Sequence, residues 1–187
     1  MKLSKRLPVI GACLGAMLSV SCTPPANNAT TQVVNDPYKN EIAFEGPIVV
    51  LEHDTSLIGT PMGTEKDCYL RGWKNKTTGV VANQLYMVVR YDGSGWRYYR
   101  SATLIGGVPL PFMSIDRQRW NCNHERSACI YREDFAVVLS ESQLRALALS
   151  GVTVEVQSKA GKDDIFSVSP EYVRNYLATV AGRSESE

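Results

Sequence analysis

The strongest strand signal in the chain is QLYMVVRY, residues 84–91, a run rich in aromatic and β-branched residues. It is followed by Asp92-Gly93-Ser94-Gly95 and then by a second strand-like run over residues 96–103. Aspartate and glycine between two such runs are typical of the turn of a β-hairpin. The sequence therefore predicts that residues 84–91 and 96–103 pair as a hairpin.

Strand signals with period two, separated by turn residues, continue on both sides of this hairpin. Few of these runs alternate with helical patterns, as a parallel sheet would require. The fold class predicted is mainly β (a β-rich α+β fold), built as an antiparallel β-sandwich or barrel. The other expected strands are residues 48–51, 68–75, 112–122, 128–138, 152–156 and 165–168.

Two short helices are expected near the C-terminus. Ser140 begins the sequence Ser-Glu-Ser-Gln, a capping box completed by Gln143, and Gly151 is a stop signal. Pro170 follows a serine and stands at the first position of a second helix, whose apolar residues recur at helical spacing to about Ala181.

Composition limits the class of protein. The chain has 187 residues, of which 44% are hydrophobic and 21% charged, with 20 Lys and Arg against 19 Asp and Glu. These values are ordinary for one globular domain and exclude a multi-span membrane protein, a collagen-like chain and a wholly disordered chain. The near balance of charge argues against a nucleic-acid partner, because such binding depends on excess positive charge. The chain has no phosphate-binding loop, and we expect no cofactor.

The N-terminus has the layout of a secretory signal peptide. Lys2, Lys5 and Arg6 form a basic start, and residues 7–20 carry no charge. This uncharged run is shorter than the roughly 20 residues that a transmembrane helix needs. Residues 1–21 are therefore predicted to be a signal peptide.

The end of this segment, Leu18-Ser19-Val20-Ser21-Cys22, resembles the lipobox of bacterial lipoproteins. Ser21 is the small residue that the family has before its cysteine, whereas the leucine stands one place further back than usual. The resemblance implies that Cys22 is the lipid attachment site, carrying acyl chains such as palmitate, and that cleavage falls before it. Because Thr23 rather than aspartate follows, it also implies the outer membrane. The alternative is ordinary signal-peptidase cleavage at the same bond, which would leave Cys22 as a free N-terminal thiol.

The remaining chain divides into three parts. Residues 22–40 comprise the lipidated cysteine and a segment rich in proline, asparagine and threonine, which predicts a flexible tether. Residues 41–182 are predicted to form a single β-rich globular domain, and residues 183–187 a polar tail. Removing the signal peptide takes away three basic residues and no acidic one, so the mature chain is slightly acidic.

Three cysteines lie in the predicted domain: Cys68, Cys122 and Cys129. An exported protein meets an oxidising compartment, where a disulfide is the default. Cys122 and Cys129 flank the tip of a predicted hairpin, so their bridge is favoured, with Cys68 left as a buried thiol. Pairing of Cys68 with either cysteine stays open, as does a zinc site of the three cysteines with His124.

The case for an enzyme is weak at the level of sequence. A hydrolase or thiol enzyme using Cys68, or the regions of His53 and His124, is one alternative. The chain has neither a G-x-S-x-G nor an H-E-x-x-H motif, so we expect no enzyme and name no catalytic residue.

A binding surface is the other candidate site. On an extended strand Trp96, Tyr98 and Arg100 would share one face, which suits stacking on a sugar or contact with a protein. The alternative is that this face belongs to the sandwich core. The leading hypothesis is a lipid-anchored envelope protein whose domain binds or scaffolds another envelope component, protein or glycan. A structural subunit of an outer-membrane assembly is a further alternative.

Overall fold

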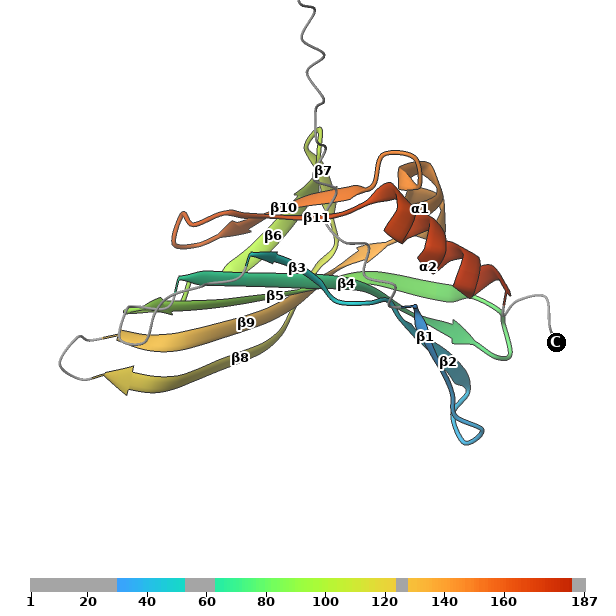
Figure 1. Ribbon diagram of the computed structural model, residues 1–187, viewed down its shortest axis with the longest axis horizontal. Helices are drawn as coiled ribbons and strands as arrows, with labels where there is room; N and C mark the ends of the chain where they lie inside the picture. Colours follow the sequence, from blue (N-terminus) through green and yellow to red (C-terminus); the bar gives the residue numbers. More distant parts are fainter. Residues whose placement is uncertain (1–29, 53–62, 124–127, 183–187) are drawn as a thin grey trace, which may run out of the picture.

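A computed structural model describes residues 30–52, 63–123 and 128–182 (Figure 1). The predicted signal peptide, Cys22, residues 23–29 of the predicted tether, both histidines and the polar tail lie outside the described residues. The described chain folds as two layers, one of which is a long antiparallel sheet.

The larger sheet has the order β1-β2-β4-β5-β9-β8, and β3 pairs with β4 beside β2. Among the described residues all its strand pairings are antiparallel, and β4, β5, β8 and β9 are its longest members. Its strands are β1 (Gln32–Asn35), β2 (Glu41–Glu45), β3 (Val49–Glu52), β4 (Thr64–Asn75), β5 (Val81–Gly93), β8 (Phe112–Asn123) and β9 (Ala128–Leu139).

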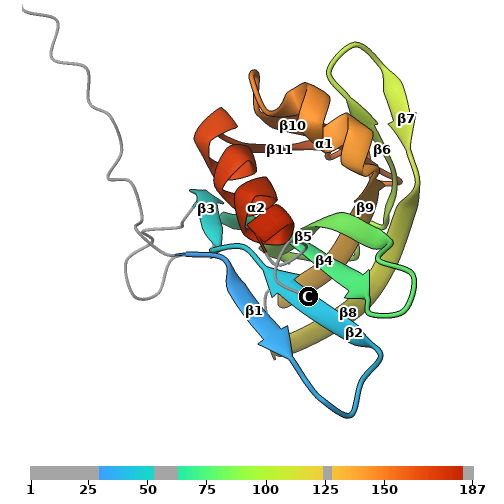
Figure 2. The same cartoon turned by 90° about the vertical axis from the view of Figure 1, so that its right-hand side faces the viewer.

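The second layer combines a smaller antiparallel sheet, of order β11-β10-β6-β7, with two helices. Figure 2 shows the helices on the same side of the larger sheet as the smaller sheet. The predicted fold class, mainly β and built as an antiparallel sandwich or barrel with two short helices near the C-terminus, is confirmed, and of the two arrangements the structure has the sandwich. The elements are β6 (Tyr99–Leu104), β7 (Val108–Leu110), β10 (Val152–Ser158), β11 (Asp164–Val168), α1 (Glu141–Leu147) and α2 (Pro170–Gly182).

The core lies between the layers and follows from the period-two pattern. Leu85, Met87 and Val89 are fully buried on one side of β5. On β9, Phe135 contacts the rings of Tyr99, Phe112 and Phe166 at centroid distances of 4.7, 5.6 and 5.8 Å. Since Tyr99 and Phe166 belong to the smaller sheet, these ring contacts join the two layers.

The predicted hairpin of residues 84–91 with 96–103 is wrong. β5 pairs with β4 and β9, whereas β6 pairs with β10 and β7 in the other sheet. Residues 96–98 are not in a strand, and Tyr98 has a φ of 57°, which turns the chain from one layer to the other. The carboxylate of Glu133 accepts the backbone N–H groups of Arg97 and Tyr98, each at 3.0 Å, and so stabilises this crossing.

The predicted tether is wrong for residues 32–35, which form β1. They pair with β2 over four residue pairs, and Val33 packs against the core. The polar composition of residues 23–40 hid the short run Gln32-Val33-Val34, whose valines favour a strand. Neither β1, β2 nor β7 was among the predicted strands.

Tyr172 of helix α2 makes hydrogen bonds at a gap in the larger sheet. β2 and β3 pair with different parts of β4, which leaves Leu70 between them. The N–H of Leu70 donates to the hydroxyl of Tyr172 (3.0 Å), and that hydroxyl donates to the carbonyl of Pro47 (2.9 Å). A buried backbone N–H needs such a partner, so Tyr172 replaces the missing strand contact.

We predict that Gly72→Ala destabilises the domain. A Cβ at this buried position of β4 would meet the hydroxyl of Tyr176 and, at 2.9 Å, the carbonyl oxygen of Ala82. Tyr176 cannot retreat without losing its 2.9 Å hydrogen bond to Asn83. Overpacking of this kind costs about 1–3 kcal/mol, measurable by urea unfolding. The control is Gly79→Asn at a turn, where nothing lies within 4 Å of a Cβ; equal losses for the two variants would contradict the prediction.

Candidate binding surface

The outer face of the larger sheet has no second layer within residues 30–52, 63–123 and 128–182. Both helices and the smaller sheet lie on the opposite side (Figures 1 and 2). Exposed sheet faces are usually polar, but this one carries three large aromatic side chains. We define the outer-face cluster as Tyr69, Arg71 and Trp73 on β4 with Gln84 and Tyr86 on β5.

Strand register brings the cluster together. Tyr69 is opposite Tyr86, and Arg71 is opposite Gln84. The residues of each strand alternate between faces, so all five side chains share the outer face. Trp73, which is half-buried, is opposite Ala82, whose side chain is small.

Arg71 is the centre of the cluster. Its Nε and Nη2 donate to Oε1 of Gln84 at 3.0 and 2.9 Å. Its guanidinium carbon lies 4.3 Å from the ring centroid of Tyr86 and 5.0 Å from that of Trp73. Cation–π contact and two hydrogen bonds hold the guanidinium in place, so the cluster is organised before any partner binds.

The phenol groups of Tyr69 and Tyr86 are neutral. Their ring centroids are 5.1 Å apart, and the hydroxyl of Tyr86 donates to Oδ2 of Asp134 at 2.6 Å. Asp134 also accepts two hydrogen bonds from Arg132. Burial and the bond to Asp134 raise the pKa of Tyr86, and burial raises the pKa of Tyr69. Both phenols therefore stay protonated at neutral pH.

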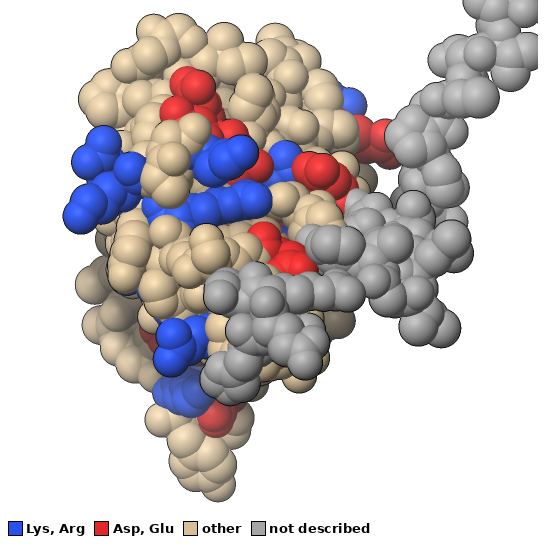
Figure 3. All heavy atoms as spheres, turned by 90° about the vertical axis from the view of Figure 1, so that its left-hand side faces the viewer, with Lys and Arg blue, Asp and Glu red and all other residues tan. Residues whose placement is uncertain are grey.

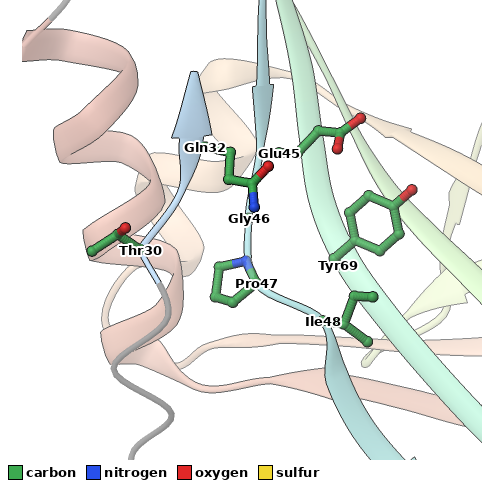
Figure 4. A pocket seen from close by; sticks show the side chains of 7 residues that line it. All are labelled: Thr30, Gln32, Glu45, Gly46, Pro47, Ile48 and Tyr69. Carbon is green, nitrogen blue, oxygen red and sulfur yellow. The ribbon is translucent and has the colours of Figure 1, made fainter. Parts of the chain in front are cut away.

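A pocket of about 330 Å³ adjoins the cluster at Tyr69 (Figure 4). Figure 4 shows the ring of Tyr69 between Glu45 and Ile48. The rim combines hydroxyl, amide and carboxylate groups with apolar surface. The lining residues are Thr30, Gln32, Glu45, Gly46, Pro47, Ile48 and Tyr69.

Comparisons of the chain with protein-family profiles, curated proteins and solved structures found no match. The geometry of the domain is therefore the basis for any assignment of function.

Most charges on the outer face are compensated within it. Arg90 donates to Asp67 at 2.9 Å, and Arg132 to Asp134 at 2.6 Å. Glu45 and Arg71 are opposite each other in register, yet Arg71 turns to Gln84. Neither Glu45 nor Arg71 has an ion pair in the part of the chain that the structure describes. The carboxylate of Glu45, a hydrogen-bond acceptor, and the guanidinium of Arg71, a donor, therefore lie side by side, and their charges sum to zero.

The predicted surface of Trp96, Tyr98 and Arg100 does not form one strand face. Trp96 packs edge-on against Tyr131, with ring centroids 4.7 Å apart, and contacts the core. Tyr98 is 44% exposed and has the guanidinium of Arg117 over its ring at 5.0 Å. Arg100 is exposed on β6. The positive φ of Tyr98 breaks the alternation on which the prediction depended.

Sequence reasoning missed the outer-face cluster although its signal was present. Residues 68–75 were predicted to be a strand, and Tyr69, Arg71 and Trp73 alternate within it at period two. The strand pairing that adds Gln84 and Tyr86 was not predictable from this pattern alone.

Charged residues also gather at the end of the sandwich shown in Figure 3, where basic and acidic side chains alternate. Lys66 pairs with Glu52 at 2.8 Å and with Asp164 at 3.2 Å, and Arg97 pairs with Asp164 at 3.2 Å. The hydroxyl of Tyr99 also donates to Asp164. These groups satisfy one another, so they serve the fold and form no open site.

The cysteines bear on the enzyme alternative. Cys122 and Cys129 form the predicted disulfide, which removes both from a zinc site. Cys68 is fully buried, and burial followed by the nearby charge of Asp67 raises its pKa to about 12. A nucleophilic cysteine needs access and a low pKa, so the described structure disfavours Cys68 as a nucleophile. Within the described ranges, no three His, Cys, Asp or Glu residues are grouped to hold a metal.

We predict that Cys68 resists iodoacetamide at pH 8 in the native protein. Its raised pKa keeps the thiol protonated, and its side chain has no exposed surface. Peptide mapping should find Cys68 unlabelled in buffer and labelled in strong denaturant without reductant. Cys122 and Cys129 should be labelled only after reduction, as the internal control; rapid native labelling of Cys68 would revive the thiol-enzyme alternative.

Proposed function

We propose that this chain is a lipid-anchored envelope protein that binds or scaffolds another envelope component through the outer-face cluster. The N-terminal sequence supports export and anchoring, since it resembles that of bacterial lipoproteins over residues 1–22. In the described residues, no helix is long and apolar enough to span a membrane. The proposed anchor is the acylated Cys22, and the outer membrane is the proposed location.

The observation that carries the binding role is the organised set of Tyr69, Arg71, Trp73 and Tyr86 on a sheet face without a second layer. Aromatic and arginine side chains dominate the energy of binding surfaces. Here hydrogen bonds and ring contacts already hold them, which lowers the entropy lost on binding. A folding role alone does not require this set, because the core lies on the other side of the sheet.

Site-specific photocrosslinking in envelopes tests the proposal. A benzophenone amino acid placed at Ala82, an exposed position beside Trp73, should form a defined adduct. The same group at Ile165, 60% exposed on the smaller sheet, is the matched control. The adduct at Ala82 should disappear when Arg71→Ala is added. Identical adducts at both positions, or adducts unaffected by Arg71→Ala, would contradict a binding role for this face.

A further inference from the structure

The chemistry of the outer-face cluster and of its pocket identifies the class of component that fits them. We infer that the ligand is a neutral glycan chain, with one sugar residue in the pocket beside Tyr69 and the following residues across Tyr86 and Trp73. This inference rests on the proposed binding function and specifies its ligand.

The pocket has the size and the groups that a sugar ring requires. Small-molecule sites occupy about 300 Å³ or more and combine apolar surface with a few polar groups. This pocket, at about 330 Å³, offers the ring of Tyr69 and the side chain of Ile48 for the C–H face of a sugar. Thr30, Gln32 and Glu45 offer a hydroxyl, an amide and a carboxylate for its hydroxyl groups.

The charge of the site favours a neutral ligand. Glu45 is exposed at the pocket and has no ion pair among the residues described, so its carboxylate would repel an anionic group placed in the pocket itself. Arg71 stands opposite it and is held by a neutral amide. An uncharged chain of hydroxyl groups, which donate and accept hydrogen bonds equally, uses both groups without burying an unpaired charge.

The surface continues from the pocket in a line that suits an extended chain. Tyr69, Arg71 and Trp73 are successive outward residues of β4 and span about 14 Å along the strand, comparable with a short oligosaccharide. Tyr86 lies beside Tyr69 with its ring 5.1 Å away. An apolar protein surface is disfavoured as the occupant, because it would cover the carboxylate of Glu45 and offer it no hydrogen-bond donor.

Titration of the folded protein with neutral tetrasaccharides tests the inference. The probes are chitotetraose and maltotetraose, with tetragalacturonate as the anionic comparator, and the readout is the shift of backbone amide signals in NMR. At least one neutral probe should shift the amides of Tyr69, Arg71 and Trp73, and tetragalacturonate should not. Tyr69→Ala and Trp73→Ala should each weaken binding about tenfold, whereas Ile165→Ala should leave it unchanged.

The variant Glu45→Gln separates the charge argument from simple contact. This variant should still bind the neutral probe and should also bind tetragalacturonate, because the repulsive carboxylate is gone. If neither neutral probe shifted the amide signals of these residues at its highest soluble concentration, the inference of a glycan ligand would be overturned. Shifts confined to the smaller sheet would overturn it as well. After such a result, a protein adduct at Ala82 in the photocrosslinking experiment would still support the proposed function. If no specific adduct formed at Ala82 either, both the glycan ligand and the proposed function would be excluded.

Discussion

Replacing Glu133 with alanine should lower the free energy of unfolding by about 3–5 kcal/mol, the largest single-residue effect on stability that we expect. Glu133 is 2% exposed and faces the interior from β9. Its Oε1 accepts from the hydroxyl of Tyr91 at 2.7 Å and from the N–H groups of Arg97 and Tyr98 at 3.0 Å. Its Oε2 accepts from Nε of Arg117 at 3.1 Å.

The size of the effect follows from what alanine would leave behind. The N–H of Tyr98 would lose its acceptor, Oε1 of Glu133, at the point where the chain crosses between the layers. Buried donors without acceptors cost more than the bonds themselves contribute. Typical domains have only 5–15 kcal/mol of stability, so the variant would lie near the limit of folding.

Urea unfolding of three variants measures this effect. Glu133→Gln keeps the shape and one acceptor oxygen, and should lose about 1–3 kcal/mol. Glu155→Ala, exposed on β10, is the matched control and should stay within about 0.5 kcal/mol of the wild type. If Glu133→Ala unfolded at the same urea concentration as Glu155→Ala, Glu133 would not stabilise the crossing. Hydrogen exchange at residues 97–99 should also accelerate in the Glu133 variants.

The contacts of Glu133 also show which part of the fold could not be predicted from local sequence patterns. Local patterns were sufficient for the capping box of α1, in which Ser140 accepts from the N–H of Gln143 at 3.1 Å and Gln143 accepts from that of Ser140. They were also sufficient for the hairpin of β8 and β9 and its disulfide. The pairing of β5 was predicted wrongly, because a carboxylate 36 residues away from Arg97 holds the chain after the bend at residues 94–95. No pattern within residues 84–103 contains that contact.

Prediction of the candidate site from sequence had the same limit. Alternation placed Tyr69, Arg71 and Trp73 on one side of a predicted strand, but not on an exposed side. That depends on the second layer, since the smaller sheet and both helices cover the other face. Trp96 gave the more conspicuous sequence signal, yet its ring packs against Tyr131. Aromatic residues indicate a surface only after the pairing of distant strands is known.

Cys22→Ser should move the protein completely from the membrane fraction to the soluble fraction and abolish labelling by radioactive palmitate. Each acyl CH₂ in a bilayer contributes about 0.8 kcal/mol, and stable anchoring needs at least two chains or signals. A triacylated Cys22 satisfies this requirement, and serine cannot form the thioether. Fractionation and palmitate incorporation of the wild type and the variant measure the change.

Two controls make the outcome specific to the proposed anchor. Cys13→Ser alters the cysteine within the predicted signal peptide and should leave both labelling and fractionation unchanged. High salt should not release the wild type, because acyl insertion depends on apolar transfer and not on surface charge. Equal palmitate labelling of the wild type and Cys22→Ser would exclude Cys22 as the anchor and favour cleavage by an ordinary signal peptidase. The outer-face cluster would then meet its ligand as part of a freely diffusing protein, so its occupancy would depend on bulk concentration and no longer on the high local concentration that a tether provides.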